Sequence, residues 1–136
     1  MTNSLMLASR HILLAGSISN TTENGLIDRA HEFVNTFVEE VLKAGGGFVI
    51  YVAAEPVNGD NKPLLFDWTI AKAVDKLTPG DSSQVRLKIV ASHERLHAKA
   101  NPEQRRLLLG MVARGVAELV PLEEEVLTGG NVGDEQ

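Results

Sequence analysis

The residues best suited to chemistry follow a short apolar run near the start of the chain, Ile12–Ala15. Small polar residues between a buried strand and a helix leave backbone N–H groups free, at the positive end of that helix. Such a turn binds phosphate or another anion, although a plain turn with a helix cap fits the same residues. The candidate ligand-binding residues here are Gly16, Ser17, Ile18, Ser19 and Asn20.

A carboxylate follows the next apolar run. Glu55 comes directly after Phe48–Ala54 and precedes Pro56. A carboxylate at a strand end can accept hydrogen bonds from ribose hydroxyls, or act as base or nucleophile at a sugar carbon. Glu55 is therefore a candidate ligand-binding residue and, in an enzyme, the catalytic one, with a solvated loop acid as the competing interpretation. Asp67, beside Trp68 at a predicted helix start, fits capping better, because it favours the helix dipole.

Basic residues gather in Ser92–Lys99, within an otherwise acidic chain. Arg95 can bind a phosphate through two parallel N–H bonds, and Ser92 adds a hydroxyl, so both are candidate ligand-binding residues. His93 and His97 have a spacing that suits a metal on a helix, but no third ligand is evident. We therefore predict no metal site and no cofactor, and a solvated loop is the competing interpretation of the stretch.

Strand-like and helix-like apolar patterns alternate along the chain and would position these residues. The predicted strands are Ile12–Ala15, Phe48–Ala54, Val85–Ala91 and Val116–Leu122, and the predicted helices are Leu26–Lys43, Leu65–Leu77 and Asn101–Arg114. This order predicts an α/β fold: a Rossmann-like three-layer α/β/α sandwich with a mostly parallel sheet of four to five strands. Ligands bind such sheets beyond the carboxyl ends of the strands, where the strand order reverses.

Two strands carry further expectations about the sheet. The first is a continuous apolar run of the kind that is covered on both faces. The third has Arg86 and Lys88 alternating with apolar neighbours, which suggests a place nearer the sheet edge. In the first helix, Phe33 recurs at the helical spacing of the apolar face and is expected to be buried.

Composition narrows the class of protein. The 136 residues fit a single domain, expected over residues 1–127, with a flexible tail at 128–136. The net charge of -5 gives no sign of nucleic-acid binding, and no apolar run approaches the roughly 18 residues of a membrane span. The absence of cysteine excludes disulfides and thiolate chemistry and fits a reducing cytoplasm. We expect a cytoplasmic protein with a small-molecule partner, no nucleic acid and no membrane.

Three short segments resemble the SLOG superfamily of Rossmann-like nucleotide-binding domains: Leu13–Ile18, Ala44–Val49 and Pro63–Leu65. That superfamily includes the DNA-processing protein DprA, the LOG phosphoribohydrolases and sensor domains of bacterial anti-phage systems. The enzymatic LOG proteins have a glycine-rich turn where this chain has Val52–Glu55. Thr128–Asn131 echoes only part of their later Pro-Gly-Gly motif. The resemblance therefore favours a sensor over a phosphoribohydrolase.

The resulting hypothesis is a binding domain for a nucleotide or a signal derived from NAD or ADP-ribose. Its phosphates would meet the loop after the first strand and Arg95, and its ribose would meet Glu55. One alternative is an enzyme that cleaves or transfers at an N-glycosidic bond, with Glu55 as the catalytic carboxylate. A second is a ligand-free dimerisation domain. A homodimer, or a place within a larger multidomain protein, is expected.

Overall fold

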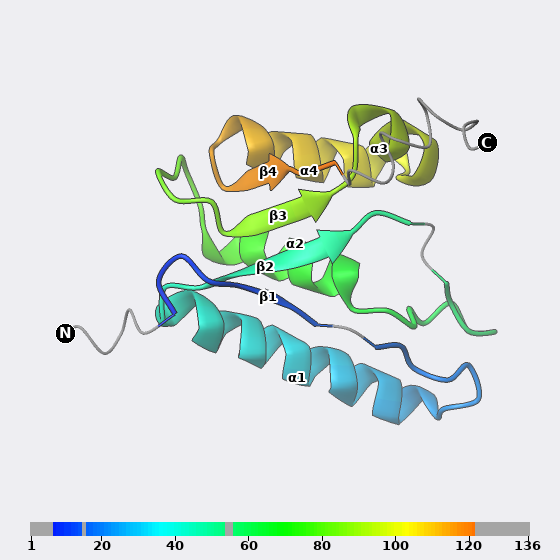
Figure 1. The fold of residues 1–136 in the computed structure, drawn as a ribbon. Coiled ribbons are helices and arrows are strands. Elements are labelled where there is room, and N and C mark those ends of the chain that lie inside the picture. The colour runs from blue at the N-terminus through cyan, green and yellow to red at the C-terminus, as the bar shows by residue number, and fades with distance from the viewer. Residues whose placement is uncertain (1–6, 15, 54–55, 122–136) are drawn as a thin grey trace, which may run out of the picture.

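A computed structural model describes residues 7–14, 16–53 and 56–121. The four strands form one parallel sheet in the order β1-β2-β3-β4 (Figure 1). This arrangement confirms the predicted α/β, Rossmann-like fold with a parallel sheet. In chain order the elements are β1 (His11–Leu13), α1 (Asn24–Lys43), β2 (Gly47–Tyr51), α2 (Asp67–Leu77), β3 (Leu87–Val90), α3 (His93–Lys99), α4 (Pro102–Ala113) and β4 (Ala117–Leu119).

The long helices lie side by side on one face of the sheet, with α2 in contact with both α1 and α4. Crossovers between parallel strands are right-handed, so a strand order without reversal sends every connecting helix to the same side. The burial of the β2 side chains agrees with helices on one side of the sheet, because Phe48 and Ile50 are fully buried whereas Tyr51 is exposed. Among the described residues, helices therefore cover one face, where the sequence had suggested both.

The strand positions differ from two expectations. β3 lies between β2 and β4, so the predicted edge position is wrong. Its alternating pattern instead reflects one covered face, where Leu87 and Ile89 are fully buried, and one open face, where Lys88 is half-buried. β1 forms an edge of the sheet, and its Leu13 is 48% exposed rather than covered on both faces.

The helices begin and end largely where local signals placed them. Asn101 and Gln104 form a capping box at the start of α4, and Pro102 occupies its first turn as predicted. Gly115, at a φ of +80°, follows the last turn. The described helices include none long and apolar enough to cross a membrane. The predicted tail at 128–136 lies outside the described residues.

Two helical details were not predicted. Ser92–Lys99 contains a short helix, α3, whose first turn is capped by the Ser92 hydroxyl accepting the Arg95 amide. In α3 only Leu96 is buried, which is too little apolar pattern to reveal a helix. Phe33 of α1 is 70% exposed, because the helix turns a different stripe toward the core. The buried residues of α1 are Ile27, Val34, Val38 and Val41.

Candidate functional site

A cavity of about 210 Å³ opens beyond the carboxyl ends of β1 and β2. The loops after the parallel strands meet at this edge of the sheet. The described strand order has no reversal, so the switch point that the sequence analysis expected is absent among these strands, and the candidate site depends on the carboxyl ends of the strands alone. The volume suits a sugar or a phosphate group rather than a whole nucleotide, since small-molecule pockets usually start near 300 Å³. Its walls are formed by Leu13, Leu14, Gly16, Tyr51, Ala53, Leu65, Asp67 and Trp68.

Larger grooves lie elsewhere, along the helical layer. One of about 480 Å³ runs beside α1 and α2, and one of about 560 Å³ lies between α2 and α4. Both are lined mainly by helical residues, and Trp68 lines the second groove as well as the edge cavity. Because the chemistry of parallel sheets is placed at the strand ends, we take the smaller edge cavity as the candidate site.

The loop after β1 contributes one wall of the cavity. Gly16 has a φ of +136°, a conformation that favours glycine, and it lines the cavity. The amide of Ile18 is already bonded to the carbonyl of Leu64 at 2.9 Å. It therefore holds the loop in place and is not available to an anion.

The helix that follows this loop begins later than the anion-site hypothesis needs. α1 starts only at Asn24, so its N-terminus does not come directly after the Gly16 turn. The Ser19 hydroxyl is bonded to the hydroxyl and the amide of Thr21. Ser17 and Asn20 are exposed. The anion site predicted for this loop therefore lacks a helix dipole directed at the Gly16 turn.

Asp67 places a carboxylate in the cavity wall at the start of α2. Its Oδ2 accepts the backbone N–H of Tyr51 at 2.9 Å, which joins the end of β2 to the start of α2. Burial raises the pKa of Asp67, and the hydrogen bonds from the amides of Tyr51 and of Asp67 itself oppose that shift. Asp67 is the first residue of α2, where its carboxylate favours the helix dipole as predicted, but the N-cap position itself is Phe66.

Arg95 lies at the carboxyl end of β2. Its Nε donates to the carbonyl of Val52 at 3.1 Å. In the described part of the chain, the terminal guanidinium nitrogens make no bond of their own. The arrangement leaves a fixed positive charge near the strand ends. Ser92 lies one turn away and caps α3.

Two further predictions concern catalysis and metals. Glu55 lies outside the described residues, so the structure does not place it. Among the residues that the structure does describe, no three His, Asp or Glu side chains gather in a way that could hold a metal ion. His93 and His97 are exposed on α3.

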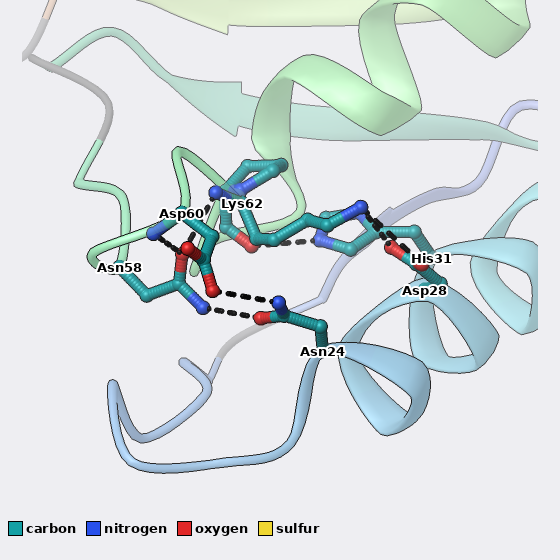
Figure 2. Close-up of polar contacts among 7 residues, drawn as sticks. Asn24, Asp28, His31, Asn58, Asp60 and Lys62 are labelled. Atoms are coloured by element: carbon teal, nitrogen blue, oxygen red, sulfur yellow. Dashed lines mark hydrogen bonds and ion pairs between the residues drawn. The ribbon is translucent and has the colours of Figure 1, made fainter.

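A network of side-chain bonds fixes the loop after β2 against the start of α1 (Figure 2). The Asn58 side-chain amide donates to Asn24 Oδ1 at 2.8 Å, and the Asn24 side-chain amide donates to Asp60 Oδ2 at 2.8 Å. Asn58 Oδ1 also accepts the backbone amides of Asp60 and Lys62, each at 2.9 Å. Asn58 therefore closes the loop and attaches it to the helix.

The same loop leads into the cavity wall. Lys62 pairs with Asp28 of α1 at 3.0 Å, and His31 Nε2 donates to the carbonyl of Pro63 at 3.0 Å (Figure 2). The next residues include Leu65, which lines the cavity. The network thus sets the position of this wall relative to β1 and β2.

We predict that Asn58→Ala lowers the free energy of unfolding by about 1–3 kcal/mol, because it removes several hydrogen bonds at once. Urea unfolding measures the loss. The matched control is Asn61→Gly in the same loop. Asn61 has a φ of +64°, which glycine adopts without cost, so its effect should stay within about 0.5 kcal/mol. Equal unfolding midpoints for the two variants would contradict the role assigned to Asn58.

The parallel sheet with a cavity at its carboxyl edge defines a Rossmann-like α/β domain, the class of fold that places ligand sites at this edge. Residues 7–136 match the family model described as "ATP nucleosidase Cap17-like, N-terminal", and the chain belongs to that family.

Two relatives are each named ATP nucleosidase Cap17, one from Escherichia coli strain KTE188 and one from Escherichia coli. Each is 40% identical to this chain over 128 residues, which is 94% of this chain and 25% of the relative. The chain thus spans about a quarter of the length of these relatives. No solved structure matches the chain.

Proposed function

We propose that the protein to which this chain belongs cleaves the N-glycosidic bond of a nucleotide, with ATP as the first substrate to test. The support is the 40% identity, over nearly the whole chain, to relatives named ATP nucleosidases. This favours the enzymatic alternative from the sequence over a sensor alone. The relatives are much longer than this chain, so the activity is proposed for the whole protein.

The reaction adds water across the bond between the base and ribose C1′. The water oxygen bonds to C1′, the C1′–N bond breaks, and the base leaves with its bonding electron pair and takes up a proton. From ATP the products are adenine and ribose 5-triphosphate. Positive charge develops on the ribose in the transition state, so an enzyme needs carboxylates near the sugar and cations near the phosphates.

Within that protein, this chain contributes a nucleotide-binding site at the carboxyl edge of its sheet. The cavity holds the ribose, and the Asp67 carboxylate accepts a hydrogen bond from a ribose hydroxyl. Arg95 binds a phosphate, with Ser92 and the polar residues of the Gly16–Asn20 loop other than Ile18 beside it. The resemblance to SLOG sensor domains supports this use of the edge. It also extends the proposal to anti-phage defence and to ligands derived from ADP-ribose.

Adenine release from ATP by the full-length protein, followed by chromatography, tests the proposal. Stoichiometric accumulation of adenine and ribose 5-triphosphate is the expected result. Release of phosphate with the adenine still attached to the sugar would identify a different reaction and overturn the proposal.

Arg95→Ala tests the site in this chain. We expect about a tenfold loss of ATP affinity, because a charge-assisted hydrogen bond to phosphate contributes about 1.5–3 kcal/mol, partly offset by solvent at this exposed position. Calorimetric titration of residues 1–136 with ATP measures the change. Arg10→Ala, at the opposite end of β1, is the control and should bind like the wild type. Equal losses in both variants would show a general charge effect instead of a site.

Glu55→Gln separates binding from catalysis. As the catalytic carboxylate, Glu55 would be needed for adenine release, whereas a glutamine can still hydrogen-bond a ribose hydroxyl, so the variant should bind ATP at saturating concentration and release little adenine. The measurement is the release rate at saturating ATP in the full-length protein. An unchanged rate would remove Glu55 from the mechanism and place catalysis in the rest of the protein.

A further inference from the structure

One face of the sheet has no described helix over it (Figure 1). In a parallel sheet, residues paired in register point to the same face. The register joins Leu13 to Val49, Val49 to Lys88 and Lys88 to Glu118, so this row crosses all the strands on the face opposite the buried Phe48 and Ile50. We call this surface the open face.

The open face is apolar over β1 and β2 and at the carboxyl end of β3, where Val90 pairs with Tyr51 and is buried, and it is charged at Lys88 and Glu118. Leu13 is 48% exposed and Tyr51 is 44% exposed, whereas Val49 between them is half-buried. Lys88 and Glu118 supply the charged part. Parallel sheets occur almost only with both faces covered. An apolar half-face of this kind is therefore expected to have a second layer packed on it.

The relatives indicate where that layer comes from. The chain spans about a quarter of their length, and its family is described as the N-terminal part. We propose that an amphipathic helix from the following part of the longer protein packs across the open face. This inference rests on the proposed function, which assigns the chain to such a protein. The apolar side of the helix would cover Leu13, Val49 and Tyr51, and its polar side would reach Lys88 and Glu118.

Packing there would also complete the nucleotide site. Leu13 and Tyr51 line the edge cavity as well as the open face. A helix seated on them adds a wall to a cavity that is small for a nucleotide, and it excludes water from the Asp67 carboxylate. The site would then be built from both parts of the protein.

Thiol labelling tests the docking, because this chain contains no cysteine. Val49→Cys is made both in residues 1–136 and in the full-length protein, and iodoacetamide labelling at residue 49 is followed by peptide mass spectrometry. We expect at least a tenfold slower labelling in the full-length protein. Glu32→Cys, on the exposed side of α1, is the control and should label at the same rate in both.

Equal labelling at residue 49 in both proteins would overturn the inference. Labelling of residues 1–136 that slows as the protein concentration rises would show a second copy on the open face, which also overturns it. Lys88→Cys lies on the same face and repeats the test if the first variant does not fold. Adenine release is measured on the same full-length samples. Protection without release would therefore contradict the proposed function and leave the docking intact.

Discussion

Gly115→Ala is expected to lower the free energy of unfolding by about 3 kcal/mol or more. Gly115 has a φ of +80°, which strains any residue with a Cβ, and an added Cβ would lie 2.3 Å from the carbonyl oxygen of Ser82. That oxygen belongs to backbone, and the Ser82 amide is itself bonded to the carbonyl of Arg114 at 2.7 Å. The contact can be relieved only by moving the loop away from α4.

The control for this prediction lies in the same helix. Gly110 is inside α4, where an added Cβ would meet no atom within 4 Å. Gly110→Ala should therefore raise the free energy of unfolding by about 1 kcal/mol through helix propensity alone. Urea unfolding of both variants gives the comparison. Wild-type stability in Gly115→Ala would show that the loop at Ser82 moves without cost, contrary to the packing described.

The elements of the fold could be predicted because their signals are local. Asn101 and Pro102 indicate the start of α4 from their own residue types. The apolar residues from Phe48 onward indicate a strand, whichever strands pair with it. The number of helical layers could not be predicted this way. It follows from the strand order, which depends on pairings such as Phe48 with Leu87, between residues far apart in the chain.

The candidate site was only partly predictable for the same reason. Gly16 is recognisable as a turn at a strand end, and it does line the cavity. The bond from the Ile18 amide to Leu64 removes one expected anion ligand, and nothing near Ile18 in the sequence reveals it. Asp67 is recognisable as a helix-start residue, but its hydrogen bond from the Tyr51 amide spans 16 positions and has no local signal. Contacts of that range appear only in the folded chain.

Asp67→Asn is expected to raise stability at neutral pH and to weaken nucleotide binding. Burial raises the pKa of Asp67 above its usual value of about 4, so the folded protein holds this proton more tightly than the unfolded chain. At a pH between the pKa of Asp67 in the unfolded chain and its raised pKa in the folded protein, folding is accompanied by the uptake of a proton. The stability of the wild type relative to Asp67→Asn therefore falls as pH rises through that window.

Urea unfolding of the wild type and Asp67→Asn from about pH 4 to pH 8 measures this difference. The asparagine oxygen can still accept the Tyr51 amide, so the comparison isolates the charge. Asp81→Asn, which removes an exposed loop acid, is the control for the loss of one negative charge. A difference between wild type and Asp67→Asn that stays constant with pH would contradict the raised pKa of this half-buried carboxylate.

Asp67→Asn is expected to weaken ATP binding, although it stabilises the fold. A charged carboxylate that accepts a ribose hydroxyl contributes about 2 kcal/mol more than a neutral amide, so Asp67→Asn should lose ATP affinity by about thirtyfold. Calorimetric titration with ATP measures the loss, again with Asp81→Asn as the control. A purely structural carboxylate would be replaced by asparagine without loss of affinity. A gain in stability together with a loss of ATP affinity would therefore show that the Asp67 charge serves binding at a cost to the stability of the fold, in addition to its position at the start of α2.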